Sequence, residues 1–193
     1  MTENIQMTLN EVITRIHPLP EACVQLLQAH ITEVSLPKGH LLLKANRVEE
    51  VVYFVKKGIV RAFSVHDDNE ITFWFGKEGD VVLSMKSYVA RESAYESIEL
   101  LEDCELYRVK TEALEMLYNS ELSIANWGRK LAERELIKTE ETLISRLFRT
   151  AAERYKALLE DSPHLVERVQ LRHIASYLGI TQVSLSRIRA EIR

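Results

Sequence analysis

Residues Val169 to Arg189, which read VQLRHIASYLGITQVSLSRIR, have the spacing of two short helices joined by a tight turn. In the first half, apolar residues recur at i, i+3, i+4 and i+7, the spacing that gives a helix one apolar face: Leu171, Ile174, Ala175 and Leu178. Gly179 follows as a residue that tolerates a left-handed turn, and the Thr181 hydroxyl can cap the free amides of a second helix. The stretch therefore predicts a helix-turn-helix.

The second helix is expected to bury Leu185 and Ile188, with Val183 beside them, and to turn its polar side chains outward. Such a helix fits the major groove of DNA, where Gln pairs with adenine and Arg pairs bidentately with guanine. We expect Arg187 to read a base, with Gln182 and Ser186 next. We expect contacts to the DNA backbone from Gln170, Arg172, Thr181, Ser184 and Arg189. The alternative is an ordinary helical hairpin that closes a small domain.

The segment IASYLGITQVSLSRIR resembles the DNA-binding helices of the Crp/Fnr transcription regulators, especially the variety in which the pattern ends SLSRIR. This resemblance covers nearly the whole chain in order. It implies an N-terminal β-roll of the cyclic-nucleotide-binding type, a long dimer helix and a C-terminal helix-turn-helix. The sequence shows no β-hairpin wing after the second helix, so a form without that wing is expected. Val183 stands where many relatives have an acidic residue, so their base preference does not transfer.

The rest of the chain predicts an α+β protein whose N-terminal part is an antiparallel, cupin-like β-roll. Leu9 to Ile31 has a helical pattern that Pro18 and Pro20 interrupt. Short β-rich runs separated by turn residues follow, at 40–44, 50–56, 59–66, 71–75, 97–101 and 105–109. Val52 to Phe63 resembles the family's strand-turn-strand signature, with Gly58 at the reversal. A short amphipathic helix begins at Thr111.

Residues 122–159 contain no proline and a single glycine, which predicts a long helix. Ile124, Trp127 and Leu131 form one apolar edge and are the predicted dimer contacts; Ile137, Ile144 and Leu147 continue an imperfect seam. A long core helix of a monomer is the alternative. Pro163 follows a break at Asp161 and Ser162. The predicted division is a sensor domain at 1–118, a dimerisation helix at 119–149 and a DNA-binding domain at 150–193.

The resemblance also implies a ligand cassette in the roll, and the candidate residues are Gly79, Asp80, Arg91, Ser93, Ala94 and Tyr95. In such sites helix amides and an arginine neutralise a cyclic phosphate, and an acidic residue holds the ribose. Here Ala94 or Tyr95 stands where the arginine belongs, and Arg91 lies about a turn away. We therefore expect no binding of cyclic AMP in the usual way. The pocket is vestigial, binds an unidentified small-molecule effector, or is filled by rings such as Tyr88 and Tyr95.

Charge is distributed unevenly along the chain. The formal net charge of the 193 residues is −4, which disfavours a protein that coats nucleic acid without specificity. From Leu165 onward the basic residues outnumber Glu167 and Glu191; they are Arg168, Arg172, Arg187, Arg189 and Arg193. This asymmetry predicts a basic DNA-reading end on an acidic sensor.

Several other functions find no support in the residues. Two cysteines cannot supply the four ligands by which some relatives hold an iron-sulfur cluster, and the six histidines lack ligand spacing, so no metal is expected. No Ser/His/Asp order, P-loop or dinucleotide motif indicates an enzyme. No run spans a bilayer, and residues 1–12 lack the layout of a secretory signal, so we expect a cytoplasmic protein without a membrane partner.

The function predicted from these observations is a homodimeric, sequence-specific transcription regulator that binds a pseudo-palindromic operator. RNA polymerase is a further candidate partner. The alternative is a sensor or protein-interaction module whose helical tail contacts protein and not DNA.

Overall fold

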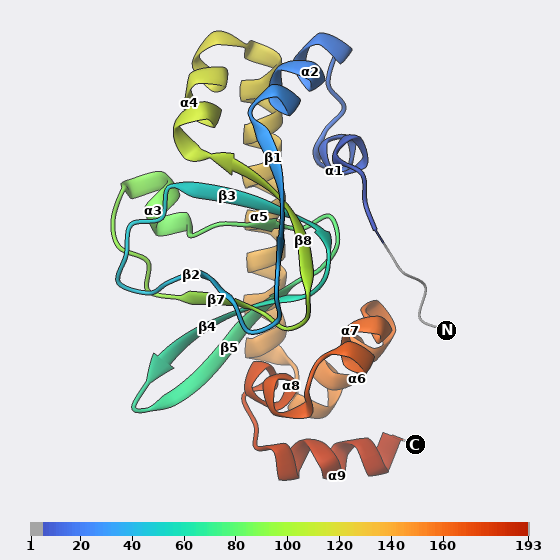
Figure 1. The fold of residues 1–193 in the computed structure, drawn as a ribbon. Coiled ribbons are helices and arrows are strands. Elements are labelled where there is room, and N and C mark those ends of the chain that lie inside the picture. The colour runs from blue at the N-terminus through green and yellow to red at the C-terminus, as the bar shows by residue number, and fades with distance from the viewer. Residues whose placement is uncertain (1–5, 193) are drawn as a thin grey trace.

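The computed structural model describes residues 6–192 as a β-roll, a long helix beside it and a small helical unit at one end (Figure 1). The helices α1 (Leu9–Ile16) and α2 (Glu21–Ala29) precede the roll. The strands are β1 (Ile31–Leu36), β2 (Leu41–Leu43), β3 (Val51–Lys57), β4 (Val60–His66), β5 (Asn69–Gly76), β6 (Val81–Val82), β7 (Ser97–Leu100) and β8 (Cys104–Lys110). The later helices are α3 (Met85–Ala90), α4 (Thr111–Ser120), α5 (Leu122–Phe148), α6 (Ala151–Asp161), α7 (Pro163–Arg168), α8 (Leu171–Leu178) and α9 (Gln182–Ile192).

The roll consists of two four-stranded antiparallel sheets, ordered β1-β8-β3-β6 and β2-β7-β4-β5. Alternation along β3 shows how the two sides are used. Val52 and Phe54 face the core that the helices share, whereas Val55 faces the interior between the sheets. The predicted fold class, an antiparallel β-roll followed by a long helix and a helical C-terminal region, is confirmed.

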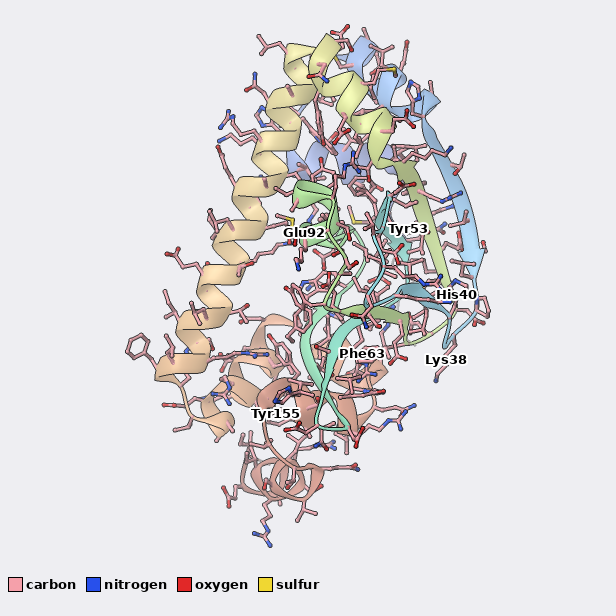
Figure 2. The ribbon with its side chains drawn as sticks, turned by 90° about the vertical axis from the view of Figure 1, so that its left-hand side faces the viewer. Lys38, His40, Tyr53, Phe63, Glu92 and Tyr155 are labelled. Carbon is pink, nitrogen blue, oxygen red and sulfur yellow. The ribbon has the colours of Figure 1, made fainter. Side chains whose placement is uncertain are left out.

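The long helix is fixed to the roll by its first half. Ile124 and Trp127 are buried in one core with residues of α1, α2, α4 and β3. The Trp127 indole Nε1 donates a hydrogen bond to the carbonyl of Ile13 at 3.0 Å, and its ring centroid lies 6.1 Å from that of Phe54. The second half of α5 carries exposed side chains and runs along the roll toward the C-terminal helices (Figure 2).

This packing corrects the predicted dimer contacts. Ile124 and Trp127 lie inside the chain's own core, and Leu131 packs partly buried against the same cluster, so none of the three offers a free surface to a second copy. The apolar spacing showed that this edge of the helix is buried but could not show what covers it.

Other differences concern short elements. The structure contains β1, the two-residue β6 and α3, none of which the sequence predicted. Ile31, placed at the end of the N-terminal helix, begins β1. The prolines separate α1 from α2 as expected, and Pro163 occupies the first turn of α7, where its missing amide leaves no helical hydrogen bond unmade.

The four helices α6 to α9 form what we call the C-terminal unit. Their core contains Tyr155, Leu165, Ile174 and Leu185. The same cluster includes Ile59, Phe75 and Leu101 of the roll, so the unit and the roll share one apolar core (Figure 2 labels Tyr155). This arrangement places α9 at the end of the molecule farthest from α1 and α2 (Figure 1).

The turn between β3 and β4 supplies a test of the roll. Gly58 has φ +119°, and a Cβ at this position would lie 2.3 Å from the Cys104 sulfur. We expect Gly58→Ala to lower the free energy of unfolding by at least about 2 kcal/mol, through backbone strain and a clash with a buried side chain. Gly39→Ala is the control, since φ there is +80° but no atom lies within 4 Å. Urea denaturation giving equal losses for both variants would contradict the clash.

Candidate nucleic-acid interface and roll pocket

The helices α8 and α9 meet in a tight turn at Gly179. This residue adopts φ 68° and ψ 32°, a left-handed conformation that glycine takes without steric cost. The amide of Ile180 donates to the carbonyl of Ala175 at 3.0 Å and closes the first helix. The Thr181 hydroxyl accepts a hydrogen bond from the amide of Ser184 at 3.1 Å and so caps α9. The predicted turn and cap are therefore present.

One face of α9 is buried and the other is exposed. Leu185 is fully buried and Ile188 packs partly buried against the same cluster. Val183, by contrast, is 64% exposed, so its predicted burial is wrong. The rest of the C-terminal unit covers only a narrow strip of α9, which contains Leu185 and Ile188 but not Val183.

The predicted DNA-contacting residues lie on the outside of the C-terminal unit. Gln182, Ser186 and Arg187 on α9 are exposed, as are the remaining candidates Gln170, Arg172 and Thr181, whereas Ser184 and Arg189 are partly buried. Within residues 6–192 no carboxylate lies within ion-pair distance of Arg187 or Arg189. Some hydroxyls already have local partners, since Ser186 donates to the carbonyl of Gln182 at 3.0 Å. The arginines are thus the strongest donors available on this face.

Not every predicted basic residue contributes to that face. Arg168 is turned toward the roll, where it pairs with Glu78 at 2.7 Å and with Glu102. Arg193 lies outside the described residues. The local excess of positive charge is therefore smaller than the sequence count indicates.

His173 is a buried histidine of α8 that sequence reasoning treated as scattered. Its side chain is 5% exposed, and its Nε2 accepts a hydrogen bond from Arg172 Nε at 3.3 Å. Burial, followed by the positive charges of Arg61 and Arg172, lowers the pKa of His173 to about 4. The neutral form is therefore part of the contact between α8 and the roll.

The six candidate ligand residues do not gather around one cavity. Gly79 has φ +85° in the turn before β6. The Asp80 carboxylate accepts from the amide of Lys77 at 3.0 Å and pairs with Lys138 of α5 at 3.2 Å, so both of its oxygens are engaged. Ala94 is buried, with its amide bonded to the carbonyl of Arg47 and its carbonyl to the amide of Asn46, each at 2.8 Å.

The other three residues are exposed but lie apart. Arg91 pairs with Glu115 of α4 at 2.6 Å, and Ser93 is exposed beside the buried Ala94. Tyr95 is exposed, with its ring centroid 6.1 Å from that of Phe73. The Tyr88 hydroxyl lies 3.2 Å from that of Tyr118. Arg91, the one arginine among the six candidates, is thus paired with a carboxylate of α4.

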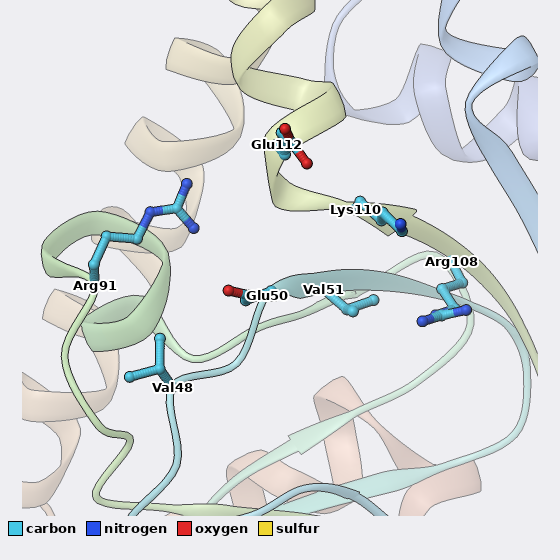
Figure 3. Close-up of a pocket in the computed structure, with 7 residues that line it drawn as sticks. All are labelled: Val48, Glu50, Val51, Arg91, Arg108, Lys110 and Glu112. Carbon is cyan, nitrogen blue, oxygen red and sulfur yellow. The ribbon is translucent and has the colours of Figure 1, made fainter.

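A pocket of about 520 Å³ lies instead at the end of the roll near α3 and α4 (Figure 3). Of the six candidates only Arg91 is among its lining residues, which are Val48, Glu50, Val51, Arg91, Arg108, Lys110 and Glu112. Arg108 lies opposite Tyr53 in the β3–β8 register, and Lys110 lies opposite Val51. Alternation along β8 does not indicate which of its faces is open, so the sequence did not predict that Arg108 and Lys110 line a pocket.

Two further properties concern residues 6–192. No three histidine, cysteine or acidic side chains in this part cluster as a metal site would require. None of its helices combines the length and apolar character needed to cross a bilayer.

Comparison with known proteins adds a domain match and a shared fold. Residues 33–121 match the model of the cyclic nucleotide-binding domain. A search of curated proteins finds no match. Among solved structures, FixK2 from Bradyrhizobium japonicum is 25% identical, covers 84% of each chain and superposes with a TM-score of 0.73.

Two more structures share the fold over most of the chain. The c-di-GMP-responsive global regulator CLP from Xanthomonas campestris is 17% identical, with 90% of this chain and 91% of that chain covered and a TM-score of 0.71. A regulator of the Crp/Fnr family from Eubacterium rectale is also 17% identical, with 92% and 87% covered and a TM-score of 0.72. Each likeness extends through the roll, α5 and the C-terminal unit.

The buried imidazole of His173 generates a pH prediction. A folded-state pKa near 4 against an ordinary 6.5 means that the unfolded chain binds the proton first, so stability falls as pH drops from 6.5 toward 4. Between pH 7 and pH 5 the loss due to this group is about 2 kcal/mol. We expect His173→Gln to flatten the pH dependence of unfolding by that amount in urea titrations. An unchanged slope would contradict the assignment; His66→Gln is the control, because the His66 side chain is 78% exposed at the end of β4.

Proposed function

We propose that the chain is a transcriptional regulator of the Crp/Fnr type that acts as a homodimer and binds a specific, pseudo-palindromic DNA site through α9. The observation that carries this proposal is the division of α9 into two faces. Leu185 holds one face in the core of the C-terminal unit, whereas Gln182, Ser186 and Arg187 project from the other.

The exposed residues have the chemistry that base edges require. A guanidinium can donate two parallel hydrogen bonds to guanine, and a carboxamide can bond adenine in both directions. Arg187 is exposed without a carboxylate partner within residues 6–192, so its donors are free to meet a base. Gln170 and Arg172 lie at the start of α8, where side chains of a helix-turn-helix contact the phosphate backbone.

The second half of α5 supplies a surface for a second copy. Leu136, Leu143 and Leu147 are spaced by seven and four residues, which places them on one face of the helix, and they are 70%, 56% and 68% exposed. Ile137 and Ile144 lie next to this face and are also exposed. We define the three leucines as the α5 stripe. An apolar stripe of this length on a helix is stabilised when another copy covers it.

We assign one role to each of three parts of the chain. Residues 1–118 are the sensor domain, 119–149 the dimer helix and 150–193 the DNA-binding domain. The sensor does not take cyclic AMP in the usual way, because Asp80 is paired with Lys138 and Ala94 is buried.

Selection of bound sites from random duplexes tests the proposed function directly. The expected outcome is two related half-sites in inverted orientation, with an affinity that falls steeply as salt rises, because bound phosphates release counterions. A tail that contacts protein would select no sequence. Failure to retain any duplex at low ionic strength would overturn the proposal.

Replacement of Arg187 tests base reading by α9. Arg187→Ala is expected to weaken binding to the selected site by about 1 to 3 kcal/mol and to relax preference at one position of each half-site. Lys156→Gln is the control, because Lys156 is exposed and belongs to α6 and not to α9. Fluorescence anisotropy with duplexes carrying all four bases at each position measures both effects. Equal base preference in Arg187→Ala and the unaltered protein would contradict the role of Arg187.

Charge placed on the α5 stripe tests dimerisation. Leu143→Glu puts two carboxylates against apolar surface in a symmetric pair, so we expect sedimentation velocity to show a monomer where the unaltered chain is a dimer. Glu141→Lys is the control, since Glu141 is exposed two positions along the helix and off the stripe. A dimer that persists in Leu143→Glu at micromolar concentration would show that the copies meet elsewhere.

A further inference from the structure

Besides sharing an apolar core with the roll, the C-terminal unit makes two separated sets of further contacts with it, which we call the two attachments; a short junction joins the unit to α5. Helix α5 ends at Phe148, Arg149 has an extended backbone with φ −105° and ψ 142°, and Thr150 already caps α6. Two non-helical residues leave rotation about the junction open. The orientation of α9 relative to α5 therefore depends on non-covalent contacts.

The first attachment is an ion-pair cluster around Arg168, the last residue of α7. Its Nη2 lies 2.7 Å from Glu78 Oε1, its Nη1 donates to Glu78 Oε2 at 3.3 Å, and its Nε donates to Glu102 Oε2 at 3.3 Å. Glu78 lies between β5 and β6 and Glu102 between β7 and β8, so one guanidinium ties α7 to two loops of the roll. A planar fork with several fixed donors suits such a double contact, which lysine cannot reproduce.

The burial of Glu78 makes its negative charge depend on the hydrogen-bond donors of this cluster. Glu78 is 4% exposed, and its Oε1 also accepts a hydrogen bond from the amide of Gly58 at 2.9 Å. Burial alone would raise the pKa of Glu78, but the hydrogen bonds from Arg168 and Gly58 outweigh it and hold the pKa below its ordinary value. A buried carboxylate deprived of its cation is strongly unfavourable. The pair therefore favours the docked arrangement over one in which α7 has moved away.

The second attachment joins α8 to the edge of β5. The Ser176 hydroxyl accepts from the amide of Thr72 at 2.9 Å and donates to the carbonyl of Glu70 at 2.8 Å, as a neighbouring strand would. Beside it, the rings of Tyr177 and Phe75 have centroids 5.3 Å apart. Contacts on two different helices of the unit restrict its rotation as well as its distance from the roll.

From this geometry we propose that Arg168 is a positioning residue for DNA recognition: by holding the C-terminal unit on the roll it fixes the direction of α9 relative to α5, and with it the half-site spacing that a dimer accepts. The inference rests on the proposed function and adds to it a residue that touches no DNA. Half-site spacing is a geometric property of a dimer, because the two recognition helices must reach successive grooves together. If the C-terminal units were less firmly held on the roll, the dimer would bind a wider range of half-site spacings, with lower affinity for each.

The test uses the full-length dimer and a series of duplexes in which the selected half-sites are separated by one base pair fewer, the selected number or one more. The variants are Arg168→Gln, which removes the ion pairs of the first attachment, and Ser176→Ala, which removes the side-chain hydrogen bonds of the second. Lys156→Gln is the matched control for loss of one positive charge from the same unit. Affinities come from fluorescence anisotropy, and melting curves establish that each protein is folded.

The unaltered protein and Lys156→Gln are expected to lose at least tenfold in affinity when one base pair is inserted or removed. In Arg168→Gln this penalty should shrink at least threefold, while base preference within each half-site stays the same. If Arg168 contributed only to general stability, Arg168→Gln would lower the affinity for all duplexes equally and leave the spacing penalty unchanged. That result would overturn the inference.

Two further readouts keep the outcomes separate. If Arg168→Gln melts below the assay temperature, Arg168→Lys and Ser176→Ala take its place, and an unchanged spacing penalty in both overturns the inference. Failure of the unaltered protein to bind any duplex would refute the proposed function itself. DNA binding with an unaltered spacing profile in Arg168→Gln would refute only the positioning role of Arg168.

Discussion

The burial of Trp127 against the roll is the contact on which the arrangement of the molecule depends. With Ile124 it anchors the first half of α5 among α1, α4 and β3, and its indole hydrogen bond to Ile13 fixes the rotation of the helix about its own axis. That rotation decides which side chains of the second half face outward. Leu136, Leu143 and Leu147 project because Trp127, several turns earlier, points inward. The proposed dimer surface is thus a consequence of the intramolecular core.

Charge in the C-terminal region has two separate uses. Arg187 stands exposed, whereas Arg168 sits between Glu78 and Glu102, where it neutralises a buried carboxylate of the roll. A count of arginines treats them alike, yet only the exposed residue can add to attraction toward phosphate. This separation explains how a chain of net charge −4 presents an exposed arginine on α9 without a large positive field.

The sequence predicted the elements whose signals are local and periodic. The turn at Gly179 and the cap at Thr181 are set by backbone conformation and a short-range hydrogen bond, so both could be predicted. What covers an apolar helix face could not be predicted, because the spacing of Ile124 and Trp127 indicates burial both in a dimer interface and in the core of one chain. The ion pairs of Arg168 join residues 90 and 66 positions apart, and no pattern in one sequence reveals such a contact.

Strand β5 connects the roll to helix α8 of the C-terminal unit. One of its edges pairs with β4 inside the roll, and its backbone at Glu70 and Thr72 bonds Ser176 of α8. Arg61 of β4 in turn pairs with Glu70 at 2.6 Å. After burial, the positive charge of Arg61 is the next cause of the lowered pKa of His173, so the same strand pair acts on α8 through charge as well as through hydrogen bonds. An effector in the roll would alter α9 only if it bound two arrangements of β4 and β5 with different affinities. The roll and the C-terminal unit share one apolar core, and a close-packed core has discrete arrangements and does not deform continuously. The two arrangements would therefore differ in the packing of the whole core, so the molecule would switch between them and not bend gradually.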